Sequence, residues 1–253
     1  MTGYLKADLN RMVFIPMAEI PLEKGLLISN GGVFAIKESF HINLYLALLM
    51  RKNTELAINT STTILQKNNF NAEFVSLLGI KVKTKFYEIN FQNGKINFAW
   101  FASKSSEHEG WFNRNYSYSV AKICLLGDIM IFNPKITLSS GILFHRISAH
   151  YFSKHIKNLA SIIGGIQIEI LPEVKFLIET FSSPRIKLEV IPYAISESER
   201  YKVIFSSERF VGMSTRVYVN KMISVDAGVE YQMWQKLADV NIFTNINLLL
   251  QFK

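Results

Sequence analysis

Three lysines that alternate with apolar residues are the clearest candidates for chemistry in this sequence. In the stretch GIKVKTKFYE, Lys81, Lys83 and Lys85 occupy every second position. Successive side chains of a β-strand point to opposite faces, so these ammonium groups would share one face and span about 13 Å. If that face lines a water-filled passage, the lysines would attract anions and repel cations.

A second interpretation of these lysines stays open, because acidic residues occupy the polar face of other alternating stretches. If carboxylates lie opposite the lysines, ion pairs would cross-link a filled interior instead of lining an open passage. The acidic candidates are Glu55, Glu169, Glu189, Asp226 and Glu230. Both interpretations require the lysines to point into the protein.

The residues best suited to nucleophilic chemistry lie in FHRISAH, residues 144–150. Ser148 and His150 would share a face of a strand and could approach each other. A histidine base also needs a group that orients it, and the sequence offers none, so we predict no catalytic residue. His145, His150 and His155 are spaced five residues apart. This spacing fits no zinc motif, and we predict no metal site and no cofactor.

Composition excludes some classes of protein. The chain has 253 residues and a formal net charge of +8, but its basic residues form no compact block and no nucleic-acid-binding motif, so we expect no nucleic-acid partner. The single cysteine, Cys124, lies among apolar residues and is expected to pack as a small hydrophobe. The longest apolar run, 44–50, is far shorter than the roughly 20 residues of a membrane-crossing helix.

Segments in which apolar and polar residues alternate recur along the whole chain. In HINLYLALLM, Leu44 and Leu46 fall on one face, whereas Tyr45 and Ala47 fall on the other; this period of two is typical of β-strands. Comparable segments occupy residues 55–66, 79–88, 94–103, 164–171, 175–181, 185–195, 200–207, 214–220, 223–233 and 239–253. Polar turn segments separate them, which predicts an all-β fold of about 12 antiparallel strands, with roughly 10 to 14 as bounds.

The chain reads as a single domain, because no linker-like segment or change of composition interrupts it. We expect an N-terminal lead-in over residues 1–25 and barrel strands and loops over residues 26–253. Two regions fit the alternation less well. Residues 105–115 are polar with isolated aromatics and are predicted to form a longer loop. Residues 145–161 are predicted to form a strand that runs into a loop or a short helix.

The alternation alone does not show which face points inward, but three features favour an apolar exterior. The segments run to about 9–13 residues, whereas soluble strands have about 5–6 and membrane strands about 9–11. The polar face mixes Asn, Ser, Thr, Gly and both signs of charge, which suits a crowded, wet interior. Many hairpin-linked strands also lose their exposed edges when the sheet closes. A soluble antiparallel protein with an apolar interior is the alternative.

The last segment, DVNIFTNINLLLQFK, resembles the closing strand of bacterial outer-membrane β-barrel proteins. In that group this strand ends in an aromatic residue that the barrel-assembly machinery recognises; Phe252 matches it, although Lys253 follows. The lead-in IPMAEIPLEKGLLISNGG is also similar to openings in this group. The resemblance implies an outer-membrane barrel, with membrane lipids and the assembly machinery as partners. The opening MTGYLKADLN has no apolar export signal, so we expect a mature or truncated chain.

These observations lead to three hypotheses about function. The first is a single transmembrane β-barrel with up-and-down topology, which acts as a passive narrow pore or a structural membrane protein; as a pore it would favour small anions through Lys81, Lys83 and Lys85. The second is a soluble or periplasmic β-barrel or sandwich that binds an apolar or anionic ligand. The third is a lipid-active outer-membrane enzyme that uses Ser148.

Overall fold

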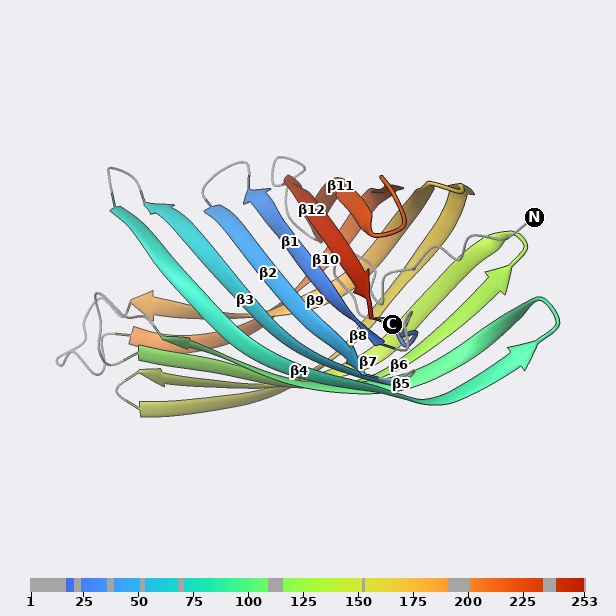
Figure 1. Ribbon diagram of the computed structural model, residues 1–253. Helices are drawn as coiled ribbons and strands as arrows, with labels where there is room; N and C mark the ends of the chain where they lie inside the picture. Colours follow the sequence, from blue (N-terminus) through green and yellow to red (C-terminus); the bar gives the residue numbers. More distant parts are fainter. Residues whose placement is uncertain are drawn as a thin grey trace.

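The described residues form one closed antiparallel β-barrel. The computed structural model describes residues 17–20, 24–35, 39–50, 53–67, 71–108, 116–151, 153–190, 201–233 and 240–252. Within these ranges there are twelve strands, which pair in chain order around a closed barrel. Figure 1 shows them as long, tilted strands. The predicted all-β barrel of about 12 strands is confirmed.

The strands are long compared with those of ordinary sheets. The strand β4 contains 21 residues, several times the roughly five or six that are usual in globular proteins. Their bounds are β1 Lys24–Ala35, β2 Ser39–Met50, β3 Thr54–Lys67, β4 Asn71–Phe91, β5 Gly94–His108, β6 Tyr116–Phe132, β7 Lys135–Tyr151, β8 Ser153–Leu171, β9 Val174–Val190, β10 Tyr201–Tyr218, β11 Ile223–Gln232 and β12 Val240–Gln251. The first strand thus begins slightly before the expected residue 26.

The first and last strands close the barrel. The strands β1 and β12 pair antiparallel from Gly25 opposite Gln251 to Ala35 opposite Asn241. Every other pairing joins strands that follow one another in the sequence. The topology is therefore the predicted up-and-down meander, in which every strand has a partner on both sides. The strands β8 and β9 pair only near the turns, from Gly164 opposite Thr180 to Leu171 opposite Val174.

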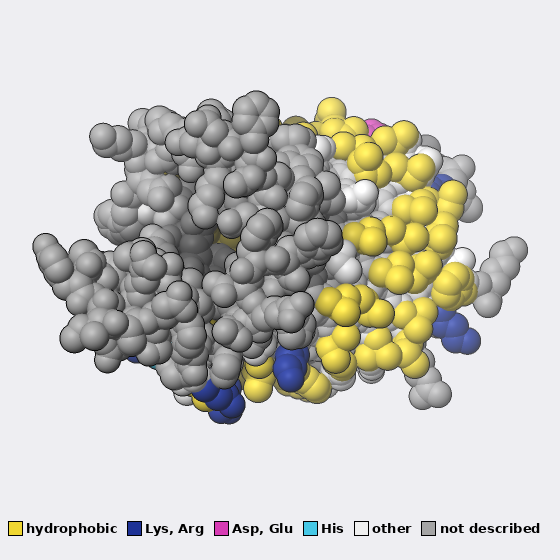
Figure 2. All heavy atoms as spheres, turned by 90° about the vertical axis from the view of Figure 1, so that its left-hand side faces the viewer, with side chains coloured by type: hydrophobic (Ala, Val, Ile, Leu, Met, Phe, Trp, Pro, Cys, Tyr) yellow, Lys and Arg dark blue, Asp and Glu magenta, His cyan; other side chains and the backbone are white. Residues whose placement is uncertain are grey.

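Apolar side chains face outward, as the long alternating segments suggested. In β2, Leu44, Leu46 and Leu48 are exposed, whereas Tyr45 and Ala47 are buried. In the C-terminal hairpin, the exposed positions include Val229, Ile242 and Ile246, whereas Asp226 and Asn247 are buried. Figure 2 shows the resulting apolar surface across the described part of one face, with basic side chains near its margins. No helix within the described residues is long and apolar enough to cross a membrane.

The two ends of the barrel differ in their connections. At the end where β1 begins and β12 finishes, two-residue turns join β4 to β5, β6 to β7 and β8 to β9. We call this the turn end. The connections at the opposite end, the loop end, vary from one residue between β7 and β8 to the longer intervals 109–115 and 191–200. Short turns at one end and longer loops at the other are typical of outer-membrane barrels.

Three local predictions from the sequence need correction. Residues 105–108 continue β5 instead of opening a loop, and residues 109–115 lie outside the described part. Residues 145–161 form the end of β7 and the start of β8, with no helix in their described part. Strict alternation along GIKVKTKFYE predicts that Tyr87 shares the face of Lys85, but the pairing of β4 with β5 shifts between these two residues. This irregularity leaves both Phe86 and Tyr87 exposed.

Candidate functional site

A short segment before the first strand lies inside the barrel. Met17, Ala18 and Ile20 are buried to 96% or more, since their relative exposures are 1%, 0% and 4%. Met17 and Ala18 belong to an apolar cluster that draws on strands from several sides of the barrel: Ala99, Phe101, Cys124, Leu126, Leu143, Ile163, Leu177 and Phe243. We call residues 17–20 the interior segment.

The interior segment also contacts the other wall. Ile20 belongs to a second buried cluster on β1, β2, β3 and β12, formed with Leu27, Tyr45, Ala47, Leu49, Ala57 and Leu249. The segment therefore links apolar patches on different parts of the inner surface. The sequence predicted only a lead-in over residues 1–25, and the placement inside the barrel was not predicted. The stretch IPMAEI is mostly apolar, and an exposed leader would not need apolar residues, so this stretch could have indicated the buried position.

Lys83 holds the interior segment to the barrel wall. Its Nζ donates to the carbonyl oxygens of Met17 and Glu19, each at 3.1 Å. The same nitrogen lies 3.0 Å from Oε2 of Glu55, and both side chains are fully buried. Glu55 and Lys83 are direct partners on β3 and β4, so strand pairing places the two charges side by side. The ammonium group of Lys83 thus contacts both the barrel wall and the interior segment.

Lys81 completes the charge pairing around Glu55. Its Nζ lies 3.3 Å from Oε1 of Glu55, and it also donates to the hydroxyl oxygen of Tyr45 at 3.3 Å. The Tyr45 hydroxyl in turn donates to Glu55. The ammonium group sits over the rings of Tyr45 and Phe101, at 5.4 and 5.2 Å from their centroids. This arrangement supplies the partly buried cation with both a counter-charge and aromatic faces.

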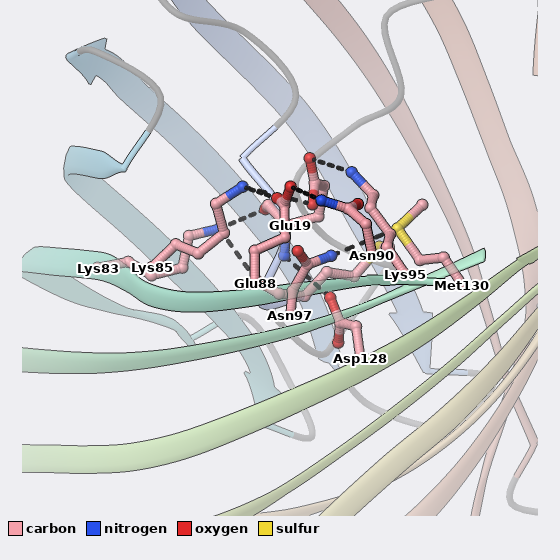
Figure 3. Close-up of polar contacts among 10 residues, drawn as sticks. Glu19, Lys83, Lys85, Glu88, Asn90, Lys95, Asn97, Asp128 and Met130 are labelled. Atoms are coloured by element: carbon pink, nitrogen blue, oxygen red, sulfur yellow. Dashed lines mark hydrogen bonds and ion pairs between the residues drawn. The ribbon is translucent and has the colours of Figure 1, made fainter. Parts of the chain in front are cut away.

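Glu19 of the interior segment connects to β4, β5 and β6. Its carboxylate lies 2.9 Å from Nζ of Lys95 and 3.8 Å from Nζ of Lys85. Its backbone N–H donates to Oδ2 of Asp128 at 2.9 Å. Lys85 also pairs with Glu88 at 2.7 Å. Figure 3 shows these side chains converging inside the barrel above β4, β5 and β6.

The structure therefore places Lys81, Lys83 and Lys85 on the inner face, where strand alternation put them. Each of the three has a carboxylate within 4 Å, so the arrangement is that of the second interpretation, a cross-linked interior. Of the acidic candidates named from the sequence, Glu55 is the one that faces these lysines. A preference for anions due to these lysines is a proposal.

The other acidic candidates have different partners. Asp226 pairs with Arg216 through two contacts of 2.6 and 3.2 Å and accepts from the Asn247 amide at 3.0 Å. Glu230 accepts from Asn241 at 2.7 Å. Glu169 pairs with Lys135 at 2.7 Å, and the side chain of Glu189 lies outside the described ones. Arg216 was not predicted as a site residue from the sequence, and it is fully buried.

The serine and histidine candidates do not assemble around one point. His145 points inward and is buried, and its Nε2 lies 3.4 Å from Oγ of Ser161. Ser148 is three residues further on β7, between the buried Ile147 and Ala149, and therefore points to the opposite, outer face. The side chain of His150 is outside the described ones. Cys124 is buried in the first apolar cluster, as its neighbours in the sequence suggested.

Phe252 follows the last residue of β12 at the turn end. Its backbone N–H donates to the carbonyl oxygen of Lys24 at 3.2 Å, so it lies beside the start of β1. Its side chain is 47% exposed, which leaves the ring accessible at the seam of the barrel. Within the described part of the chain, no group of three His, Cys, Asp or Glu residues is placed to hold a metal ion.

Known proteins resemble this chain in fold at very low sequence identity. No protein-family model matches the chain, and no curated protein sequence matches it significantly. Solved structures similar to it include bacterial outer-membrane β-barrel proteins. The translocator domain of autotransporter NalP from Neisseria meningitidis is 9% identical, with a TM-score of 0.49 over 90% of this chain and 87% of that chain. Outer membrane protein Omp33 from Acinetobacter baumannii is 8% identical, with a TM-score of 0.40 over 91% and 99% of the respective chains.

Proposed function

We propose that the chain is an integral β-barrel of a bacterial outer membrane. The single observation that carries this proposal is the distribution of side chains across the barrel wall. Large apolar side chains point outward, including Ile80, Ile162 and Ile170 with 62%, 74% and 63% exposure. Charged side chains such as Lys83 and Arg216 point inward and are fully buried. Lipid around the barrel would cover the apolar wall, whereas water would disfavour it by about 25 cal/mol per Å².

The soluble alternative predicts the opposite arrangement. A soluble barrel or sandwich needs its apolar side chains inside and its charges in water. Here the buried polar residues include Glu55, Lys83, Asp128, Arg216 and Asp226. Extraction of the protein from cells distinguishes a membrane barrel from a soluble one. A membrane barrel should sediment with membranes and need detergent for extraction. Recovery of folded protein in buffer alone would contradict the membrane location.

The ends of the barrel suggest its orientation. Outer-membrane barrels place short turns in the periplasm and longer loops outside the cell. The turn end of this barrel, which carries Lys24 and Phe252, would then face the periplasm. The accessible ring of Phe252 at that end suits the proposed role as a signal for the barrel-assembly machinery.

Within the membrane, we propose that the barrel is a narrow pore that the interior segment keeps closed. The segment packs against two apolar clusters of the inner wall and receives hydrogen bonds from Lys83. Its departure would also remove the Glu19 carboxylate from Lys85 and Lys95. Four lysines would then share Glu55, Glu88 and Asp128, so the open passage would favour anions through Lys81, Lys83 and Lys85.

Planar bilayers test the pore part of this proposal. Full-length protein should conduct little, and a variant that lacks residues 1–20 should conduct with a preference for anions. In that truncated background, Lys85→Glu should shift the preference toward cations, because it reverses the charge of a lysine that Glu19 no longer neutralises. A change of gel mobility on boiling would first establish that each variant folds. If the truncated protein conducts no ions, the pore is excluded and a structural role remains.

A further inference from the structure

Two exposed cations lie on the outer wall near the loop end. Lys104 of β5 and Arg146 of β7 are both exposed. The residues immediately before and after each of them point to the inner face of the barrel, so the two cations point outward. The register places them in one row, Lys104 opposite Ala121 and Ala121 opposite Arg146. Two strand spacings separate them, which is about 10 Å. The small side chain of Ala121 leaves the surface between the two cations open.

This basic row borders the apolar wall on the side of the loops. The next outward row toward the turn end contains Ile123 and Phe144, with 58% and 51% exposure. The row beyond that contains Leu125 and Ile142, with 54% and 49% exposure. On β5, β6 and β7, the next row toward the loops consists of hydroxyl side chains: Ser106, Ser119 and Ser148. The exposed Leu78 and Ile156 flank this row on β4 and β8, so the polarity of the wall changes at the basic row on the three strands β5 to β7.

The height of the row matches the border of a membrane. Arg146 lies 11 residues from Lys135, the first residue of β7 (146 − 135). At about 3.3 Å per residue and a tilt of roughly 35–45°, this places Arg146 about 26–30 Å above the turn end. The apolar band of outer-membrane barrels is about 25 Å tall. Lys104 and Arg146 thus lie where the headgroups of the loop-end leaflet would be.

No carboxylate neutralises the two cations from the described rows around them. By register, the row itself and the rows on either side of it contain no Asp or Glu on β4 to β8. Other lysines of the barrel are placed differently: Lys83 pairs with Glu55 and the exposed Lys135 pairs with Glu169. A basic pair at a lipid border, without a protein carboxylate beside it, is complementary to an anionic headgroup.

We propose that this basic row binds the phosphate of a phosphorylated lipid in the loop-end leaflet. The phosphate would lie over Ala121, with Lys104 on one side and the planar guanidinium of Arg146 on the other. The serine hydroxyls would donate from above, and the acyl chains would follow Ile123 and Phe144. This inference rests on the proposed membrane location and adds to it the class of lipid and the place where it binds.

The test measures binding of diphosphoryl lipid A to folded protein in mixed detergent micelles by native mass spectrometry. A dephosphorylated form of the same lipid and excess inorganic phosphate are the comparison probes. The variant Lys104→Gln/Arg146→Gln should bind diphosphoryl lipid A about 30-fold more weakly, because each cation near a membrane surface contributes about 1 kcal/mol. The matched control Lys135→Gln/Arg209→Gln removes two other exposed cations and should bind within about twofold of the unmodified protein.

Several results would overturn the proposal. Equal binding by the Lys104→Gln/Arg146→Gln variant would exclude the row as the site. An equal loss in the control variant would show that binding depends on net charge alone. Equal binding of the dephosphorylated lipid would exclude phosphate recognition, and displacement by inorganic phosphate would identify a free anion as the ligand. None of these results affects the membrane location, which fails separately if the folded protein needs no detergent.

Discussion

Replacing Lys83 with methionine tests whether the buried ion pairs hold the barrel and its interior segment together. The substitution keeps an unbranched side chain but removes the ammonium group that lies 3.0 Å from Glu55 and 3.1 Å from the carbonyl oxygens of Met17 and Glu19. Removing one member of a buried ion pair costs about 3–5 kcal/mol, because the remaining charge stays buried with less compensation. Lys81 still contacts Glu55 at 3.3 Å, which places the expected loss at the lower end of that range.

The assay is the free energy of unfolding in urea, followed by tryptophan fluorescence of protein refolded into lipid vesicles. Lys135→Met is the matched control, since Lys135 pairs with Glu169 at 2.7 Å but is 64% exposed, and exposed pairs contribute about 0–1 kcal/mol. Lys83→Met should also raise conductance in planar bilayers, because the interior segment loses two hydrogen bonds. Equal stability of the Lys83→Met and Lys135→Met proteins would refute the reasoning from burial.

Three further predictions concern other parts of the barrel. Arg216→Met should lower the free energy of unfolding by about 3–5 kcal/mol because it leaves Asp226 buried without its 2.6 Å partner; a loss below that of Lys135→Met would contradict this. Ile246→Lys places a charge on the apolar outer wall midway along β12, where Ile246 is 58% exposed, and should cost about 2–4 kcal/mol for refolding into vesicles; no loss would argue against lipid contact. Phe252→Ala should slow the appearance of folded barrel in the outer membrane of cells while leaving refolding in detergent unchanged; an unchanged rate in cells would exclude Phe252 as an assembly signal.

The arrangement of the wall could be predicted from the sequence because a strand has a period of two. Once Leu44 and Tyr45 are assigned to opposite faces, the alternation assigns each other residue of the same strand to one of the two faces. The same rule placed Lys81 and Lys83 together. It failed at Tyr87, since an irregular pairing between β4 and β5 shifts the alternation by one residue. Nothing in the local pattern around Phe86 marks that position.

Partners across neighbouring strands depend on register, which the pattern of one strand does not contain. Glu55 was one of five acidic candidates, and only the pairing of β3 with β4 sets it opposite Lys83. Arg216 and Asp226 are likewise opposite each other on β10 and β11. In a short hairpin the turn determines the register, so this second pair could have been found from the sequence.

The sequence by itself determined the kind of wall: long alternating strands, with charges on the opposite face from the large apolar side chains. These features are local, because each depends on the direction of successive side chains along one strand. The tertiary structure alone decided what fills the interior. Met17 and Glu19 lie far in sequence from Leu143 and Asp128, and closure of the whole sheet is needed before these residues share one space. The role of the lead-in therefore follows from the shape of the closed barrel.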